Sequence, residues 1–342
     1  MDWAELNHDL LCQIAKKVRD ISDFVRFRAV CKQWRSAVHP TDLPPQLPYF
    51  IQCIRSSNSS FDFQFHPLSF DKTYNLTVQI SSSPEDPFIL FGSFTGYLLL
   101  LFRKTPGLIL NPLTGLQAII PVENKNPFMP LYFGPSCSHE PNLVESGIDL
   151  VGYPNGSVVP KVILWRYTNS KWRRITEICY GYDEYVASYS SGRVYIVSYE
   201  TKNIRVVDVN NGNTVSLLPE VSSDQYYCIV EACHDLIGVR EFHPEQDLYK
   251  YELYQHKDSG TNPSWAKVND IGDQMLFHDH HFKSLCLKAS DFEGCKGNCI
   301  YSRTSSSVNC YSVAMKTTTQ MHLFRPRFHD HYLKSTWFLP SP

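Results

Sequence analysis

The sequence carries almost no excess charge of either sign and contains no long apolar segment. Its 342 residues include 32 Lys and Arg against 34 Asp and Glu, which leaves a formal net charge of −2. Such a balance provides no overall attraction to nucleic acid or to an anionic membrane surface. The longest apolar run, Tyr97–Phe102, is far too short to span a bilayer. We therefore expect a protein that binds neither nucleic acid nor membrane and that recognises its partners by local surface chemistry.

The chain also lacks the cysteine patterns of secreted and zinc-binding proteins. Its 11 cysteines are irregularly spaced, and none forms a CxxC pair. The first residues, Met1–Glu5, are acidic, and no apolar stretch of secretory length follows them. An odd number of cysteines without a signal peptide indicates reduced thiols in the cytosol or the nucleus. We therefore expect a cytoplasmic protein, a nuclear protein, or one found in both places.

Catalytic motifs are missing as well. The sequence contains no nucleophile elbow, Walker loop, dinucleotide-binding loop or HExxH motif. Acidic pairs occur at Glu85–Asp86 and Asp183–Glu184, but a glycosidase needs two acids placed across a cleft. Adjacent acids in a loop are ordinarily solvated. These absences predict a non-catalytic binding protein without a cofactor.

The most metal-like cluster is the His-Asp-His-His run at residues 278–281. Zinc needs three or four ligands that converge on one point, commonly with a spaced second pair, and no such pair lies nearby. Because consecutive residues of a strand alternate sides, a polar loop is the favoured interpretation, here and for His329–His331. Half-buried strand thiols are also the expected role of two cysteine pairs, Cys228 with Cys233 and Cys295 with Cys299. The sequence thus predicts no metal site.

The first forty residues do contain helical periodicity, unlike the rest of the chain. Ser22 and Asp23 offer N-cap side chains to a second helix that begins at Phe24. A short third helix ends at His39, because the residue before a proline disfavours the α region. Forty residues are too few to bury a self-sufficient core, so this segment requires a partner. The apolar positions at helical spacing are Leu10, Leu11, Ile14, Ala15, Val18, Phe24, Phe27, Val30 and Cys31, followed by Trp34 and Val38.

Residues 41–48 are rich in proline and predict a stiff, extended linker. Beyond them, short apolar runs alternate with turn residues, which is typical of an antiparallel sandwich, barrel or propeller. Internal similarity favours the propeller, because Gly92–Leu100 is echoed by Ser188–Ile196. Candidate repeats begin near residues 61, 96, 147, 192, 238 and 297, at the spacing of propeller blades of about 40–50 residues. We predict a mainly β chain with a propeller of about six blades at 49–342.

Two groups of motifs resemble a known family. Leu6-x3-Leu10-Leu11-x2-Ile14, followed by Asp23–Arg35 with its Val-Cys-Lys-x-Trp-Arg ending, resembles the F-box. The rest of the chain resembles the kelch-like repeat domain of plant F-box proteins, in the F-box/kelch-like kinase-interacting group. The matching segments are Gly92–Leu98, Leu110–Gly115, Ala289–Tyr301 and Trp337–Ser341. The resemblance covers nearly the whole chain, although the middle third matches only in its general pattern.

The resemblance implies an F-box at residues 1–40 and a target-binding propeller behind the linker. In that family the F-box docks on a small Skp-type adaptor, which links it to a cullin scaffold carrying a RING subunit. The propeller then presents a target protein for ubiquitylation. One departure is Asn7, which stands where a proline usually preorganises the helix start. Carried over by position, the F-box core and adaptor-binding residues are Leu6, Leu10, Leu11, Ile14, Val18, Phe24, Phe27, Val30, Cys31 and Trp34.

Other interpretations of the same residues stay open at this point. The helices are alternatively a cap packed on the β-domain, although the proline-rich linker favours helices held away from it. The function is alternatively that of a binding platform that inhibits or sequesters a partner without engaging an adaptor. A propeller hydrolase would require acidic, basic or tyrosine side chains that converge at the central channel.

Overall fold

The computed structural model of the chain describes 23 stretches of sequence that include every helix and strand given below. The described residues are 6–18, 20–39, 42, 46–55, 60–68, 73–79, 87–93, 95–102, 106–112, 115–120, 128–135, 148–154, 160–190, 192–219, 221, 227–232, 235–242, 250–257, 263–279, 283–292, 295–303, 307–321 and 334–339.

Three short helices form the N-terminal part: α1 (His8–Ala15), α2 (Ile21–Ala29) and α3 (Lys32–Ala37). They enclose a small apolar core around Leu11, Phe24 and Phe27. The second helix begins three residues earlier than the sequence predicts. Its N-cap is Asp20, whose carboxylate accepts a hydrogen bond from the backbone N–H of Ser22 at 2.7 Å. The predicted caps, Ser22 and Asp23, lie inside the helix, because several acceptors compete for one helix start and tertiary contacts select among them.

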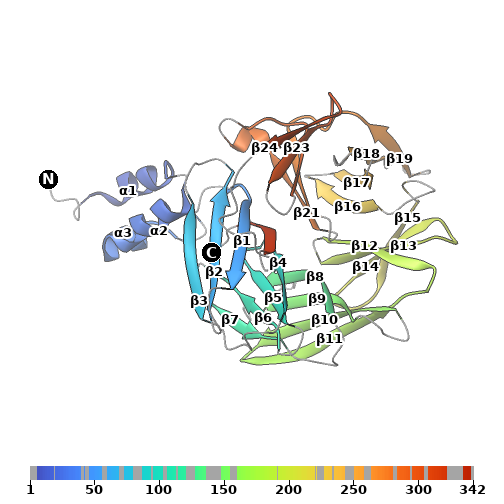
Figure 1. Ribbon diagram of the computed structural model, residues 1–342, viewed down its shortest axis with the longest axis horizontal. Coiled ribbons are helices and arrows are strands. Elements are labelled where there is room, and N and C mark those ends of the chain that lie inside the picture. The colour runs from blue at the N-terminus through green and yellow to red at the C-terminus, as the bar shows by residue number, and fades with distance from the viewer. Residues whose placement is uncertain are drawn as a thin grey trace.

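Six β-sheets follow around a common centre and form the predicted six-bladed propeller (Figure 1). In each of the first five sheets the strands follow an antiparallel order from the centre outward. The first sheet consists of β25 (Lys334–Phe338), β1 (Tyr49–Arg55), β2 (Ser60–Pro67) and β3 (Tyr74–Gln79), and the second of β4 (Phe88–Gly92), β5 (Leu98–Phe102), β6 (Leu108–Leu110) and β7 (Gln117–Ile119). The third consists of β8 (Phe128–Pro135), β9 (Ile148–Pro154), β10 (Lys161–Thr168) and β11 (Lys171–Cys179), and the fourth of β12 (Glu184–Ser190), β13 (Arg193–Ser198), β14 (Asn203–Asp208) and β15 (Thr214–Pro219). The fifth consists of β16 (Tyr227–Ala232), β17 (Asp235–Phe242), β18 (Lys250–Lys257) and β19 (Ser264–Val268).

The sixth sheet departs from the antiparallel pattern that the sequence predicts. Its order is β21-β20-β22-β23-β24, and β20 pairs with β22 in parallel. After β20 the chain turns inward to form β21. It then crosses back past β20 before β22 begins, because a parallel pair requires a crossover connection. Part of that connection is a 3-10 helix, η3 (Ala289–Asp291). The strands of this sheet are β20 (Gln274–Asp279), β21 (Lys283–Lys288), β22 (Cys299–Arg303), β23 (Val308–Ser312) and β24 (Thr317–Met321).

The two ends of the propeller sequence meet in the first sheet. The C-terminal strand β25 pairs with β1 in an antiparallel register in which Trp337 lies opposite Phe50, and β25 also contacts β4 of the second sheet (Figure 1). The backbone N–H of Gly92 donates to the hydroxyl of Thr336 at 2.7 Å. A Cβ atom on Gly92 would lie 1.6 Å from the carbonyl oxygen of Trp337, so only glycine fits this seam. One C-terminal strand thus closes the ring.

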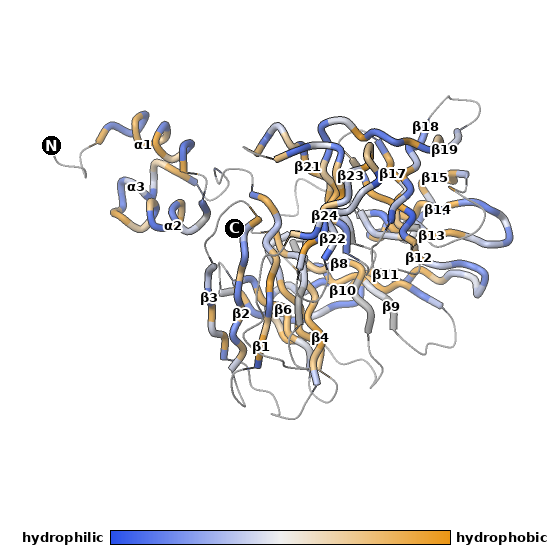
Figure 2. The backbone as a smooth tube through the Cα atoms, turned by 45° about the horizontal axis from the view of Figure 1, so that its top comes forward, coloured by the Kyte–Doolittle hydropathy of each residue, from blue (hydrophilic) through white to orange (hydrophobic). Residues whose placement is uncertain are grey.

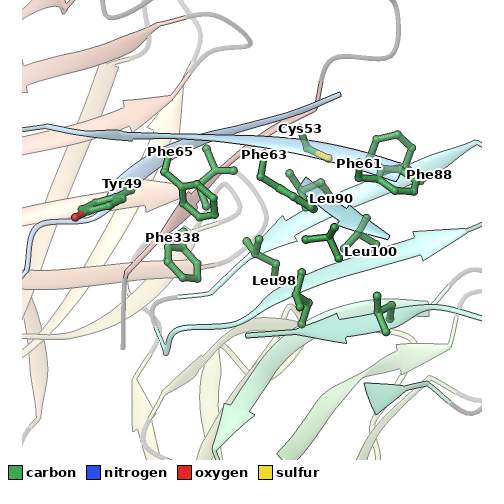
Figure 3. Packing of buried hydrophobic residues seen from close by; sticks show 14 residues of the cluster. Tyr49, Cys53, Phe61, Phe63, Phe65, Phe88, Leu90, Leu98, Leu100 and Phe338 are labelled. Carbon is green, nitrogen blue, oxygen red and sulfur yellow. The ribbon is translucent and has the colours of Figure 1, made fainter. Parts of the chain in front are cut away.

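The core of the propeller lies between neighbouring sheets. Between the first and second sheets, Phe61, Phe63 and Phe65 pack with Phe88 and neighbouring leucines (Figure 3). The rings of Phe61 and Phe88 meet edge to face, with centroids 5.0 Å apart. Equivalent apolar clusters separate each further pair of sheets, and the last joins the sixth sheet to the first. This arrangement explains why the sheets have apolar residues on both faces.

The predicted repeats have the correct period, but four of their six starting points fall at the second strand of a sheet. The predicted starts near residues 96, 147, 192 and 238 lie at or close to the beginnings of β5, β9, β13 and β17. Gly96 and Gly192 adopt positive φ angles of 85° and 76° in the turn between the first and second strands. In the second and fourth sheets the recurring glycine therefore marks an internal hairpin and not the border between blades.

Candidate functional site

The ten residues predicted to form the adaptor-binding helical domain divide into two groups in the structure. Leu11, Phe24 and Phe27 are buried. Leu6, Val18 and Trp34 pack against this core from its margin, and the rings of Phe27 and Trp34 lie 4.5 Å apart. Cys31 has a local role, since its sulfur accepts a hydrogen bond from the backbone N–H of Trp34 at the start of α3. These residues hold the helices together.

The other group is apolar and exposed. Leu10 is 48% exposed, Ile14 39% and Val30 58%. Leu10 and Ile14 are four residues apart on α1 and therefore share one face of that helix. Val25, which is 54% exposed on α2, belongs with them, and the sequence analysis missed it. Its signal was available, because an apolar residue that follows buried Phe24 directly must point away from the buried side of the helix. Leu10 and Ile14 form the candidate docking surface on α1, and Val25 and Val30 are further exposed apolar positions on and at the end of α2.

Asn7 compensates for the proline that is expected at its position. Its side-chain oxygen accepts a hydrogen bond from the backbone N–H of Asp9 at 2.9 Å, and it is the N-cap of α1. Asparagine is among the most favourable N-cap residues, and proline at the first turn serves the same helix start through a preset φ angle. The helix start is therefore stabilised by a side-chain cap.

The helical domain contacts the outer strand of the first sheet. The hydroxyl of Tyr74, on β3, donates a hydrogen bond to the carboxylate of Asp20, the N-cap of α2. The rings of Tyr74 and Tyr49 stack beside this contact. Figure 2 shows the three helices next to the first sheet, at the edge of the propeller. Tyr74 thus links the helical domain directly to the propeller.

Of the predicted linker 41–48, the structure describes residues 42 and 46–48, and the last three of these lie against the propeller. Gln46, Leu47 and Pro48 are buried, and Leu47 packs in the apolar cluster between the sixth and first sheets. At the other end, His39 and Asp42 form a turn, in which the backbone N–H of His39 donates to the Asp42 carboxylate at 2.7 Å. The contact between Tyr74 and Asp20 contradicts the expectation that the helices are held away from the β-domain. Local composition predicted stiffness, but burial against the propeller decided the path of the chain.

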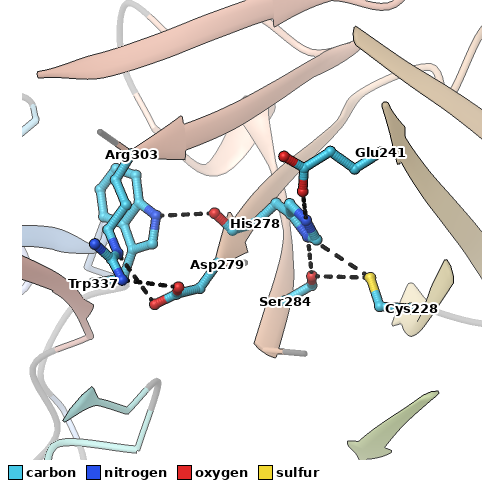
Figure 4. Close-up of polar contacts among 7 residues, drawn as sticks. All are labelled: Cys228, Glu241, His278, Asp279, Ser284, Arg303 and Trp337. Atoms are coloured by element: carbon cyan, nitrogen blue, oxygen red, sulfur yellow. Dashed lines mark hydrogen bonds and ion pairs between the residues drawn. The ribbon is translucent and has the colours of Figure 1, made fainter. Parts of the chain in front are cut away.

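The first two residues of the metal-like cluster belong to a strand and contact different partners. His278 and Asp279 end β20 and are both buried, so at these two positions the predicted polar loop is wrong. His278 Nε2 lies 3.1 Å from Glu241 Oε2, whereas Asp279 forms an ion pair of 3.1 Å with Arg303 (Figure 4). His280, His281 and the 329–331 cluster lie outside the described residues. Among the residues that are described, no group of three or more His, Cys, Asp or Glu is arranged to hold a metal ion.

His278 lies at the centre of a polar contact between the fifth and sixth sheets. Its Nδ1 lies 2.9 Å from the Ser284 hydroxyl and 3.7 Å from the sulfur of Cys228 (Figure 4). Burial would lower the pKa of His278, but the Cys228 sulfur and the Glu241 carboxylate outweigh it and raise that pKa to about 10. The imidazole is therefore cationic at neutral pH. The pair joins two blades electrostatically, and no local sequence pattern indicates this partnership.

The stability of the chain is expected to fall on both sides of about pH 6.5, the ordinary pKa of histidine. His278 has a raised pKa in the folded state, so its contribution is complete below pH 6.5 and is lost as pH rises towards about 10. Burial lowers the pKa of His66 to about 4, so its contribution is present above pH 6.5 and is lost as pH falls towards 4. Urea unfolding from pH 4 to 10 measures both effects. A His278→Gln variant should flatten the alkaline side only, and His66→Gln the acidic side only.

The acidic pair Asp183–Glu184 has a structural role. Asp183 accepts a hydrogen bond from the Ser198 hydroxyl at 2.9 Å. Glu184 accepts one from the backbone N–H of Gly181 and forms an ion pair of 3.1 Å with Arg205. Both carboxylates therefore stabilise turns and strands of the fourth sheet through hydrogen bonds and an ion pair. The other pair, Glu85–Asp86, lies outside the described residues.

A pocket of about 320 Å³ opens between the fourth and fifth sheets. Arg193, Glu231 and Asp235 contribute charges to its wall, and Leu218 and Leu236 contribute apolar surface. The Tyr195 hydroxyl donates to Glu231 at 2.7 Å, which fixes one wall of the pocket. The volume lies at the lower end of the range for small-molecule sites. None of these residues was singled out in the sequence, because strands of two different blades bring them together.

Comparisons with known proteins agree with this division into two parts. Residues 3–43 match the F-box domain family, and residues 65–324 match the KIB1-4 beta-propeller family. An F-box/kelch-repeat protein of Arabidopsis thaliana is 24% identical over 331 residues, which cover 87% of this chain and 83% of the relative. The F-box protein SKIP23 of Arabidopsis thaliana is 24% identical over 327 residues, covering 81% of this chain and 78% of the relative.

Solved structures show a more distant similarity. TolB from Acinetobacter baumannii has a TM-score of 0.43 at 10% identity, covering 84% of this chain and 66% of the other. The WD40 domain of SCAP from fission yeast has a TM-score of 0.35 at 10% identity, covering 77% of this chain and 69% of the other. None of the helices within the described residues is long and apolar enough to cross a membrane.

Proposed function

Because the chain belongs to the F-box proteins that carry a KIB1-4 β-propeller, we propose that it is the substrate-recognition subunit of a Skp–cullin–F-box ubiquitin ligase. The F-box binds a Skp-type adaptor, and through it a cullin–RING scaffold. The propeller holds a target protein. The chain performs no chemistry of its own and needs no cofactor, and it acts in the cytoplasm, the nucleus or both.

One observation carries the proposal. The helical domain has a closed core, yet Leu10, Ile14, Val25 and Val30 remain exposed on its surface. Leu10 and Ile14 share one face of α1, and exposed apolar side chains that adjoin on a small domain mark a surface that binds another protein. The contact between Tyr74 and Asp20 supports the same function, because it ties this surface to the propeller that would hold the target.

The mechanism is an increase in effective concentration. A target held on the propeller and a ubiquitin carrier held through the adaptor become parts of one assembly, so the transfer of ubiquitin to a target lysine is effectively intramolecular. The buried linker residues Gln46–Pro48 favour this mechanism because they limit the range of positions that the F-box can adopt. The target can be identified by affinity capture with and without proteasome inhibition.

Charged substitutions on α1 are expected to abolish adaptor binding. In the double variant Leu10→Asp and Ile14→Asp, two exposed apolar side chains become charged, and each such contact at the centre of an interface contributes about 2–4 kcal/mol. The affinity for a purified Skp-type adaptor, measured by calorimetry, should fall at least about 100-fold. The melting temperature should change little, because both side chains are already partly solvated.

The matched control is Gln13→Asp, which adds a negative charge to an exposed polar position of the same helix. It should bind the adaptor almost like the natural chain. If the natural chain itself fails to bind at micromolar concentrations, the ligase proposal is wrong, and a platform that sequesters a partner without an adaptor becomes the better account.

A further inference from the structure

The sixth blade contains two cysteines whose strand register brings them together. Cys299 lies on β22 and Cys310 on β23, and the antiparallel pairing places Tyr301 opposite Cys310 and Cys299 opposite Ser312. Residues opposite each other, and alternate residues of one strand, share a face of the sheet. Cys299 and Cys310 are therefore diagonal neighbours on one face. Both are free thiols, and the Cys299 thiol donates a hydrogen bond to the carbonyl oxygen of Gly297 at 3.3 Å.

The two thiols differ in acidity. The hydrogen bond from Cys310 favours the Cys299 thiolate, burial opposes it, and the nearby Lys296 cation favours it again. The net effect lowers the pKa of Cys299 to about 7. The hydrogen bond with Cys299 and burial both raise the pKa of the Cys310 thiol. At neutral pH the pair therefore holds a substantial fraction of one thiolate next to one thiol, the combination that oxidises most readily.

We infer that Cys299 and Cys310 form a redox-sensitive site, in which hydrogen peroxide converts the two thiols into a reversible disulfide. The Cys299 thiolate attacks one peroxide oxygen, the O–O bond breaks, and water leaves after protonation, which produces a sulfenic acid. The sulfur of Cys310 then attacks the sulfenic sulfur. The S–S bond forms, the S–O bond breaks, and the hydroxyl leaves as a second water with the thiol proton. Both thiols are oxidised, and one molecule of hydrogen peroxide is reduced.

The position of the pair favours reversibility. Diagonal neighbours in a sheet are farther apart than directly opposed residues, so a disulfide between them requires the two strands to shift, is strained, and is more easily reduced. Cys299 is only 8% exposed, so a small oxidant or a dithiol reductant reaches the site from the side of the partly exposed Cys310. These properties are typical of labile disulfides that respond to redox conditions.

The site is connected to the seam that closes the propeller. Tyr301, between the two cysteines, stacks on Phe277 with ring centroids 4.9 Å apart. Phe277 in turn meets Trp337 of β25 edge to face at 5.6 Å. Leu47 of the linker packs in the same apolar cluster. Oxidation of the pair therefore acts on the apolar cluster between the sixth and first sheets, in which Trp337 of the closing strand and Leu47 of the linker both pack. This inference does not depend on the ligase proposal.

Peptide mapping after mild oxidation tests the site. The purified full-length chain is treated with hydrogen peroxide at a stoichiometric concentration, and the alkylated digest is analysed by mass spectrometry before and after dithiothreitol. We expect a peptide cross-linked between Cys299 and Cys310, about 2 Da lighter than its reduced components, and its disappearance after reduction. Cys310→Ser should instead leave a sulfenic acid on Cys299 that dimedone traps. No cross-link in the natural chain would overturn the inference.

Cys295 provides the matched control. It packs against the same apolar cluster, and burial raises its pKa. Cys295→Ser should leave the cross-link intact, whereas a disulfide that includes Cys295 would contradict the assigned pair. Thermal unfolding then tests the connection to the seam. Oxidation should raise the melting temperature of the natural chain by a few degrees, because it closes a short loop, and should not raise that of Cys310→Ser. An equal response in both chains would overturn the connection.

Discussion

A chain that ends at residue 333, before β25, is expected to lose the cooperative unfolding transition of the propeller. Trp337 and Phe338 of this strand are each 1% exposed. Trp337 meets the rings of Phe50 and Phe277, and Phe338 meets Phe65. Removing one buried aromatic side chain costs about 3–5 kcal/mol. The loss of two such side chains, together with the hydrogen bonds between β25 and β1, would remove a large part of the 5–15 kcal/mol that typically stabilises a folded domain.

Near-ultraviolet circular dichroism during heating measures this effect. The truncated chain should show a weak aromatic signal and a broad transition, while the natural chain shows a single sharp one. Gly92→Ala tests the same seam with one added methyl group, which would clash with the carbonyl oxygen of Trp337, and should also destabilise the ring severely. Tyr182→Ala is the control, because this aromatic side chain is 80% exposed. A truncated chain that melts like the natural one would show that β25 does not close the ring.

Glu241→Gln is expected to reduce the free energy of unfolding by about 3–5 kcal/mol near neutral pH, the cost of breaking a buried ion pair from one side. The substitution leaves the His278 imidazolium buried between two blades without its carboxylate partner. His278 must then lose its proton, so the fall in stability between pH 6.5 and 10 should become smaller. Urea unfolding at several pH values measures both consequences.

A double variant and an exposed pair serve as controls. Combining Glu241→Gln with His278→Gln should cost less than the sum of the two single changes, because the partners form one unit. The ion pair between Lys267 and Glu252 is more exposed, with Lys267 50% accessible. Lys267→Gln should therefore change the stability by about 1 kcal/mol or less. Equal costs for Glu241→Gln and Lys267→Gln would mean that the His278 contact does not join the blades.

The helical domain shows what local sequence patterns can predict about burial and what they cannot. Helical spacing identified Leu11, Phe24 and Phe27 as interior residues, and the structure buries all three. The same spacing could not separate them from Leu10, Ile14 and Val30, which stay exposed. Three helices bury only part of their apolar surface against each other, and which part depends on how they cross. Packing also placed the N-cap of α2 at Asp20, where the carboxylate meets both Ser22 and Tyr74.

The sequence by itself determined the two-part organisation, the mainly β class and the number of blades, because turn residues and alternating apolar runs recur at the period of a blade. Tertiary structure alone decided the contacts between blades. The closing strand β25, the crossover in the sixth blade and the partnership of His278 with Glu241 all join residues that are distant in sequence. The energy of such contacts depends on the three-dimensional arrangement, so no local pattern records them.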